Sequence, residues 1–159
     1  MRNTHENRRH LVARAGLLLA ALGIPFAALA DSTSTRYQVD SSAGTVLDRK
    51  TTLTWERGVS TTALSFGEAG SRCAARGEGW RLPGKKELES LVWSNESPTI
   101  DSDAFPDAIP LSAGTTLFWT GTSFAGAVGS SWTVNFATGE SYSVLEETGG
   151  CLVRCVLSN

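Results

Sequence analysis

The stretch from Gly79 to Leu91 constrains the fold of this chain more than any other, because a strand signal, a stop signal and a helix signal follow one another there. The strand-like segment Trp80–Leu82 is stopped by Pro83, which lacks a backbone donor. Gly84 can then serve as the N-cap of a short helix, and Glu87 lies in the first turn, where the helix dipole favours a negative charge. This order of residues is typical of a packing corner rather than of a catalytic site.

Two arginines are expected to lie among buried residues. The favoured interpretation gives Arg81 and Arg154 an internal ion pair or a carbonyl contact, with Glu87 and Glu89 as candidate partners of Arg81. A ligand-binding role for either arginine is the alternative. The residues assigned a structural role in this motif are Trp80, Arg81, Leu82, Pro83, Glu87 and Arg154.

The N-terminus has the pattern of a secretory signal. Basic residues precede an apolar run, 17–29, which is too short to span a bilayer and ends in Ala28-Leu29-Ala30. We expect a signal peptide at 1–30, a polar leader at 31–36 and one domain at 37–159. The domain would be exported to the periplasm, the cell surface or the medium, with no membrane insertion after cleavage; a retained signal-anchor helix is the alternative.

Charge and histidine content exclude several functional classes. Without the leader, ten basic and fifteen acidic residues remain, so the formal charge is −5. A mildly acidic domain is a poor general binder of nucleic acid, and we expect no nucleic-acid partner. His5 and His10 both lie in the leader, which excludes Ser-His-Asp and Cys-His catalysis and histidine-ligated zinc from the domain. We expect no cofactor and no enzymatic activity.

Export changes the interpretation of the three cysteines, because thiol pairs outside the cytoplasm tend to become structural bridges. In one extended strand, Cys151 and Cys155 would hold their Cα atoms roughly 13 Å apart, which is too far for a disulfide. Cys73 can pair with either of them, and we favour Cys73–Cys155. Cys151 is then expected to be buried and inert, with pairing to another chain as the alternative.

Hydrophobic periodicity predicts an α+β domain. The expected strands cover 37–39, 45–48, 53–56, 117–120, 132–136, 141–145 and 152–157. Ser65 and Glu68 form the sequence pattern of a capping box, and the helix that they start turns Cys73 toward the core. A second helix follows Pro83. A long loop, 94–114, comes next, and long loops on a rigid scaffold commonly carry binding sites.

Among the tryptophans, Trp93 is the best candidate for an exposed aromatic side chain on which a sugar could stack. It lies about 140° around its helix from Leu88, outside the apolar stripe. Trp55 and Trp80 are expected to be core residues. Trp132 is expected in the core as well, because it alternates with apolar residues along its strand.

Three aspartates, Asp101, Asp103 and Asp107, cluster in the long loop. The favoured interpretation is that they are solvated or cap turns. Calcium ligation through their oxygens and glycosidic catalysis by a pair of them are the alternatives. With Trp93, they form the candidate ligand-binding set.

These motifs, in this order, resemble the family named after the C-terminal domain of the Legionella collagen-like protein, Lcl. The matching pieces, besides the Cys73 helix, are 45–48, 53–57, 79–83, 86–92, 100–101, 104–106, 118–120, 132–136 and 153–156. The sequence departs from the family pattern at Gly84, where a threonine cap is usual, and at Cys151, an additional thiol.

The resemblance implies a fold distantly similar to C-type lectins and to the formylglycine-generating enzyme. In that fold two short helices pack on a twisted antiparallel sheet beside a long irregular loop region. It also implies a cell-surface or secreted binding module, since the founding member is regarded as an adhesin that recognises sulfated glycans.

The expected function is therefore that of a non-enzymatic, adhesin-like module. It would recognise a glycan or a cell-surface protein through the loops between Trp93 and Ser131. One alternative is a polysaccharide-acting enzyme that uses the loop carboxylates. The other is a structural envelope component whose chains are joined through Cys151; the sequence sets no oligomeric state.

Overall fold

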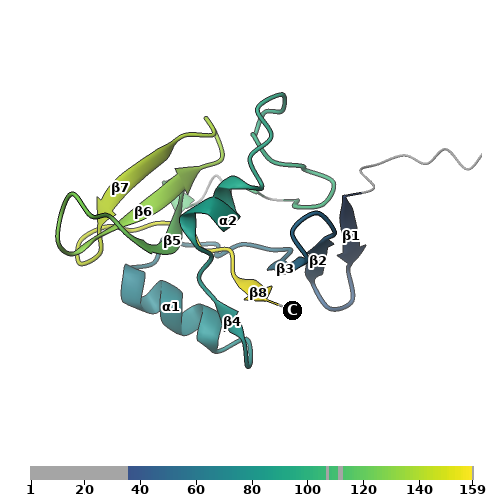
Figure 1. Ribbon diagram of the computed structural model, residues 1–159, viewed down its shortest axis with the longest axis horizontal. Coiled ribbons are helices and arrows are strands. Elements are labelled where there is room, and N and C mark those ends of the chain that lie inside the picture. Colours follow the sequence, from purple (N-terminus) through teal and green to yellow (C-terminus); the bar gives the residue numbers. More distant parts are fainter. Residues whose placement is uncertain (1–35, 107, 111–112, 159) are drawn as a thin grey trace, which may run out of the picture. The chain divides into compact units, whose positions relative to one another are not determined.

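The computed structural model describes residues 36–106, 108–110 and 113–158, which form two β-sheets and two short helices (Figure 1). This confirms the expected α+β class. The proposed signal peptide and most of the polar leader lie outside the described residues. Within the described ranges, no helix has both the length and the apolar character needed to cross a bilayer.

The first sheet is antiparallel, with the strand order β1-β2-β3-β8-β4. Its strands are β1 (Tyr37–Asp40), β2 (Thr45–Asp48), β3 (Leu53–Glu56), β4 (Trp80–Arg81) and β8 (Val156–Ser158). The expected hairpin is confirmed, since Thr45 pairs with Glu56. The last strand is shorter than the expected 152–157. Cys151 and Leu152 instead form isolated bridges outside the named strands.

The second sheet has the order β5-β6-β7 and is also antiparallel. Its strands are β5 (Leu117–Ser123), β6 (Ser130–Asn135) and β7 (Ser141–Leu145), which confirms the three strands expected there. The outer edge of β5 is covered by Leu152, whose carbonyl accepts from the Trp119 amide at 3.0 Å. The segment before β8 therefore ties the second sheet to the first.

Both helices begin where the sequence predicts. Helix α1 (Phe66–Ala74) has a full capping box, in which the Ser65 amide donates to the Glu68 carboxylate at 2.8 Å and the Ser65 hydroxyl accepts from the Glu68 amide. Helix α2 (Lys85–Glu89) has half of one, because glycine has no side chain: the Gly84 amide donates to Glu87 at 2.6 Å. In Figure 1, α2 lies beside β5 and β6, and α1 lies beside β4, in agreement with their contacts.

Two buried clusters occupy opposite faces of β5. Phe118 belongs to the larger cluster, which also contains Trp55 and Leu88, and Trp119 belongs to the smaller one around Cys73. The loop between α2 and β5 has no α-helix or strand among its described residues, and Phe105 anchors it in the larger cluster. A loop fixed by its own buried side chains can hold surface residues in defined positions.

Trp132 corrects an expectation. Val134 and Phe136 are fully buried, but Trp132 is only half-buried and belongs to neither core cluster. Its indole packs edge-on against Phe124 at 4.9 Å between ring centroids, and the Lys85 ammonium lies 4.7 Å from its ring centroid. Alternation placed Trp132 on the same face of its strand as Val134 and Phe136. On that face its indole meets Lys85 and Phe124 rather than core residues.

Candidate functional site

Trp93 is exposed as expected, with 45% of its surface accessible, but α2 ends at Glu89, so Trp93 lies in the segment after the helix rather than on it. With Arg36, Tyr37 and Val92 it lines a surface hollow of about 270 Å³. The Trp93 amide donates to the Thr99 carbonyl at 2.9 Å, so the turn that carries the indole is closed by the long loop. We call the hollow lined by Arg36, Tyr37, Val92 and Trp93 the Trp93 hollow.

The first strand supplies the other wall of the Trp93 hollow. The Arg36 guanidinium lies 4.7 Å from the Tyr37 ring centroid and forms a two-point ion pair with Asp48, with distances of 3.0 and 2.7 Å. It also donates to the Ser90 carbonyl at 2.8 Å. Burial raises the pKa of Tyr37 to about 12, so its hydroxyl stays protonated at neutral pH. Arg36 and Tyr37 are therefore held in place before any ligand binds.

The structure describes two of the three aspartates, Asp101 and Asp103, and they lie in one turn. Asp101 is half-buried, and its carboxylate accepts from the Asp103 and Ala104 amides at 3.1 and 2.9 Å, which is a turn cap. Asp103 is exposed, and Asp107 lies outside the described residues. Asp101 is near the Trp93 hollow, since its charge acts on the pKa values of both Arg36 and Tyr37.

The described side chains provide no ready metal site. In the ranges that the structure covers, no group of three or more His, Cys, Asp or Glu residues is arranged to hold a metal ion. Calcium ligation by the loop aspartates depends on Asp107 and stays a prediction. Of the candidate ligand-binding residues, Trp93 lines the hollow, Asp101 lies near Arg36 and Tyr37, and Asp103 is on the loop surface.

Comparison with known protein families decides the classification. The model of the family described as the Lcl C-terminal domain matches residues 44–157, which is most of the chain. The chain belongs to the Lcl C-terminal domain family. A search of curated proteins found no match.

The corner motif of this Lcl C-terminal domain is structural, but one expectation about it is wrong. Arg81 forms the expected ion pair with Glu87, with both distances at 2.8 Å, and also donates to the Ser158 hydroxyl. Its side chain is 43% accessible rather than buried, because β4 is an edge strand of two residues. Pro83 is buried, and its carbonyl accepts from the Gly121 amide at 2.8 Å, which joins the corner to β5.

Trp80 corrects a second expectation, because it was expected in the core but is only half-buried. Trp80 and Leu82 lie against the smaller core cluster. The Arg76 guanidinium stacks on the Trp80 ring at 4.4 Å. The partly exposed edge of Trp80 is therefore covered by a cation, and Trp93 remains the large exposed indole among the described residues.

Arg154 is fully buried and meets backbone carbonyls, as the favoured interpretation predicts. Its Nη1 donates to the carbonyls of Glu56, Arg57 and Gly58. Burial lowers the pKa of Arg154 to about 10, which leaves it charged at neutral pH. Its Nε and Nη2 have no hydrogen-bond partner, and Phe105 lies 4.8 Å from the guanidinium carbon. Its position supports a structural role.

The expected disulfide is present between Cys73 and Cys155. Cys151 is a free thiol with 1% of its surface accessible, and burial raises its pKa to about 12. A buried, protonated thiol is a poor nucleophile, which fits the inert role expected for Cys151.

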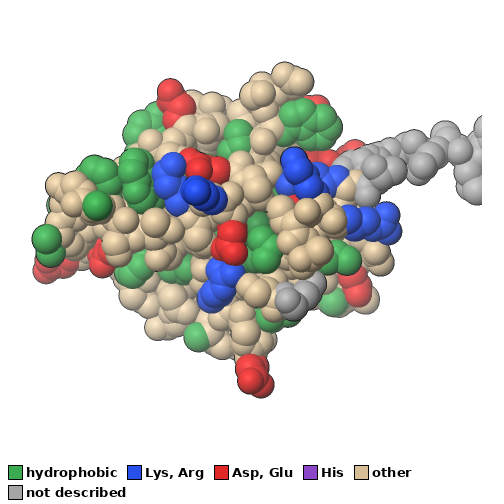
Figure 2. All heavy atoms as spheres, in the orientation of Figure 1, with side chains coloured by type: hydrophobic (Ala, Val, Ile, Leu, Met, Phe, Trp, Pro, Cys, Tyr) green, Lys and Arg blue, Asp and Glu red, His purple; other side chains and the backbone are tan. Residues whose placement is uncertain are grey.

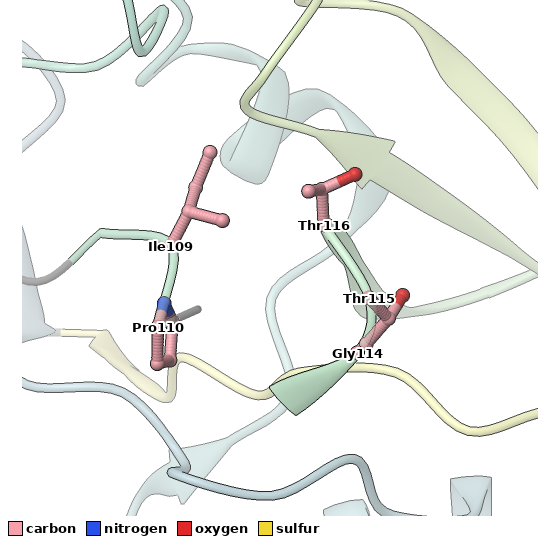
Figure 3. Close-up of a pocket in the computed structure, with 5 residues that line it drawn as sticks. All are labelled: Ile109, Pro110, Gly114, Thr115 and Thr116. Atoms are coloured by element: carbon pink, nitrogen blue, oxygen red, sulfur yellow. The ribbon is translucent and has the colours of Figure 1, made fainter. Parts of the chain in front are cut away.

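A second hollow, of about 260 Å³, lies in the long loop (Figure 3). Ile109 and Pro110 face Thr115 and Thr116 across it, and Gly114 completes its lining. Residues 111–112, which connect its two sides, lie outside the described residues. We assign no ligand to this hollow.

Sequence reasoning missed Arg36 and Tyr37 as parts of the candidate site. Arg36 had been placed in the polar leader and Tyr37 in an ordinary strand. Their contact with the turn after α2 is long-range, since Arg36 and Ser90 are 54 residues apart in sequence. The local signal was limited to Asp48, a carboxylate at the end of a hairpin strand, which also accepts from the Lys50 amide and the Thr51 hydroxyl in its own turn.

Proposed function

We propose that this Lcl C-terminal domain is a non-enzymatic binding module that recognises a glycan at the Trp93 hollow. The observation that carries the proposal is the half-exposed indole of Trp93, set in a hollow beside a second aromatic ring and a fixed guanidinium. Sugars present apolar C–H faces and hydroxyl rims, and sites of this kind combine aromatic walls with a few polar groups.

The electrostatics of the hollow support binding rather than catalysis. Arg36 is committed to Asp48 and the Ser90 carbonyl, so it can orient a ligand without changing its own ionisation. Of the acidic residues near the hollow, Asp48 is paired with Arg36, and Asp101 uses its carboxylate to close a turn. Glycosidases need two carboxyl groups facing the scissile bond, and a polysaccharide-acting enzyme using Asp101 and Asp103 is therefore the less favoured alternative.

The proposal includes two finer expectations. The module acts after export, in the periplasm, at the cell surface or in the medium. Its two short helices, antiparallel sheets and long core-anchored loop belong to a C-type-lectin-like arrangement. The support for the second expectation is the order of elements together with the placement of the loop beside Trp93.

Glycan binding can be tested by titrating the purified protein with sulfated and unsulfated glycans, with and without calcium, by calorimetry. We expect Trp93→Ala to weaken binding about tenfold or more, because one stacked aromatic contributes on the order of 1–2 kcal/mol. Val128→Ala is the matched control, since Val128 is fully exposed on the β5–β6 loop and does not line the hollow.

Each result of that titration has a meaning. Equal affinities of the Trp93→Ala and wild-type proteins would refute the hollow as the binding site. Release of shortened sugars during the titration would support the enzyme alternative. Binding that requires calcium would support calcium ligation by the loop aspartates.

A further inference from the structure

The outer edge of β7 is an open β-strand edge. β7 is the last strand in the order β5-β6-β7, and no described strand pairs with its other side. Figure 1 shows β7 at the margin of the second sheet. An open edge presents backbone donors and acceptors that can template the addition of another strand.

Two hydrogen bonds determine which β7 residues face β6. The Asn135 amide donates to the Glu140 carbonyl at 2.8 Å, and the Glu146 amide donates to the Gly129 carbonyl at 2.9 Å. In an antiparallel pair, hydrogen-bonded and non-bonded residues alternate along each strand. Even-numbered residues of this segment therefore direct their backbone groups toward β6, and odd-numbered ones direct theirs outward.

The outward-facing groups belong to Ser141, Ser143 and Leu145. The Leu145 carbonyl is already occupied by the Gly149 amide at 2.9 Å. The N–H and C=O of Ser141, the N–H and C=O of Ser143, and the N–H of Leu145 remain available for a partner strand. Tyr142 and Leu145 add apolar surface, with 42% and 55% of their surfaces exposed.

Other edges in the described chain are better protected. β4 has only two residues, and the outer edge of β5 is covered by Leu152. β1 has four residues and ends in a charged aspartate. β7 is five residues long and carries no charge, no proline and no bulge among its paired residues. Among the described strands, β7 is therefore the longest open edge and the one with the fewest features that oppose the addition of another strand.

Acidic residues flank β7 at both ends. Glu140 precedes it, and Glu146 and Glu147 follow it. Glu140 and Glu146 accept from the Tyr142 and Ser131 hydroxyls, and neither has an ion-pair partner among the described residues. In Figure 2, acidic and hydrophobic side chains lie near one another at the left of the view, where Figure 1 shows β7.

The flanking acids argue against a second copy as the occupant of the edge. Antiparallel self-pairing centred on Ser143 would place Glu140 opposite Glu146 of the other copy, twice by symmetry. Like charges directly opposite each other destabilise a strand pair. An extended segment with basic residues at both ends would instead meet opposite charge at both ends.

We propose that the β7 edge binds an extended, basic-ended protein segment by β-strand addition. The segment contributes uncharged, strand-forming residues opposite Ser141–Leu145 and a lysine or arginine opposite Glu140 and Glu146. Backbone hydrogen bonds supply the contact, and the flanking charges set orientation and register. This surface shares no residue with the Trp93 hollow, although Gly139, next to Glu140, lies close to Val92 of that hollow.

The test uses a seven-residue peptide with lysine at each end and alternating threonine and valine between them. It is titrated into the ¹⁵N-labelled protein and followed through backbone amide shifts. We expect shifts centred on Ser141, Ser143 and Leu145, and an affinity that falls as salt rises. A peptide with glutamate ends and a backbone N-methylated copy of the lysine peptide should each bind at least about tenfold more weakly.

Variants of the protein separate edge pairing from simple charge attraction. Ser143→Pro removes an outward N–H that makes no bond in the fold, and proline is tolerated at such positions. It should weaken peptide binding about tenfold, whereas Ser143→Ala, which keeps the backbone donor, should change it less than about twofold. Glu140→Gln combined with Glu146→Gln should abolish the salt dependence.

Three outcomes would overturn the proposal. They are no β7 shifts at millimolar peptide, equal binding of the N-methylated peptide, and undiminished binding by a folded Ser143→Pro protein. The N-methylated peptide keeps the test decisive if Ser143→Pro fails to fold. Loss of glycan binding in Trp93→Ala leaves this test unaffected, because the two surfaces share no residues.

Discussion

The two sheets of this domain are stabilised by different kinds of interaction. In the first sheet, buried polar residues are charged: Asp48 and Glu56 lie in paired strands, and Arg154 precedes β8. In the second sheet, the buried polar residues are hydroxyls, such as Thr120 and Thr133, which donate to backbone carbonyls of neighbouring strands. The disulfide also belongs to the first region, since Cys155 directly precedes β8.

The difference shows where solution conditions can act. Glu56 accepts from Arg72 at 2.8 and 2.6 Å, from Arg76 at 3.0 Å and from the Cys155 amide at 3.1 Å. Acid and reductant therefore act on the same small region, where α1 meets β3 and β8. Among its described residues the second sheet has no disulfide and no buried charge, and its serine hydroxyl contacts to carboxylates, from Ser131 to Glu146 and from Ser141 to Glu89, involve partly exposed acids.

Removing the disulfide should have the largest effect and gives the strongest test of this contrast. Cys73→Ala with Cys155→Ala should lower the free energy of unfolding by about 4 kcal/mol, given a sequence separation of 82. Denaturant unfolding measures the loss. Hydrogen exchange should show α1 losing protection before β5 and β6. Cys151→Ala is the matched control, because Cys151 is in no disulfide.

Equal loss of protection in both sheets would contradict the contrast. A larger loss for Cys151→Ala than for the double variant would show that packing around the smaller cluster matters more than the bond.

Glu56→Gln should have the next largest effect. It removes the charge that both Arg72 and Arg76 contact, and Glu56 itself is buried while each arginine is 28% accessible. We expect a loss of about 2–3 kcal/mol in denaturant unfolding, somewhat below the range for fully buried pairs because the arginines can turn to solvent. Thr133→Val is the control from the second sheet and should cost about 1 kcal/mol. A larger loss for Thr133→Val than for Glu56→Gln would contradict the contrast between the two sheets.

The pH dependence of stability should also arise in the first sheet. Burial alone would raise the pKa of Asp48 and of Glu56. Bonds from Arg36 to Asp48, and from Arg72 to Glu56, outweigh burial and lower the two pKa values below their ordinary 3.8 and 4.5. The folded state therefore binds fewer protons near these values, so this stability is present above pH about 4–5 and is lost as the pH falls through the folded pKa values.

Denaturant midpoints at pH 7, 4 and 3 measure this effect. Asp48→Asn with Glu56→Gln should flatten the acid side of the stability curve, while Glu147→Gln, an exposed residue next to the second sheet, should leave it unchanged. A curve that keeps its slope in the double variant would assign acid sensitivity to other carboxylates.

The sequence predicted those structural features that depend on residues close to one another along the chain. The capping box at Ser65 and the hairpin after Asp48 specify local geometry, and both are present. The alternation expected in β6 is incomplete, because Thr133 is fully buried and Trp132 is half-buried. Trp93 is exposed as predicted, but it lies beyond the end of α2 at Glu89, so its angle on that helix is not the cause. Capping and turn signals need no knowledge of the tertiary fold.

The errors in the sequence-based predictions concern contacts and burial that long-range packing determines. Arg81 was expected to be buried among apolar neighbours, but its strand lies at a sheet edge, which no local pattern shows. Arg36 reaches Ser90 across the fold, and Arg72 meets Glu56 only because the disulfide holds α1 against β8. Trp93 could therefore be predicted from sequence as part of the candidate site, and Tyr37 and the cationic wall formed by Arg36 could not.

The smallest predicted effect concerns Arg81, and it sharpens the contrast between buried and exposed charge. Arg81→Ala should lower the free energy of unfolding by about 0.5–1 kcal/mol, because the pair with Glu87 is partly solvent-exposed and screened by salt. Thermal unfolding at low and high salt measures it, and Glu87→Ala, which also removes the acceptor of the Gly84 amide, should cost slightly more. If the melting temperature of Arg81→Ala is unchanged but glycan binding is lost, the structural role of Arg81 is wrong. The exposed corner would then belong to the binding surface rather than to the frame that supports it.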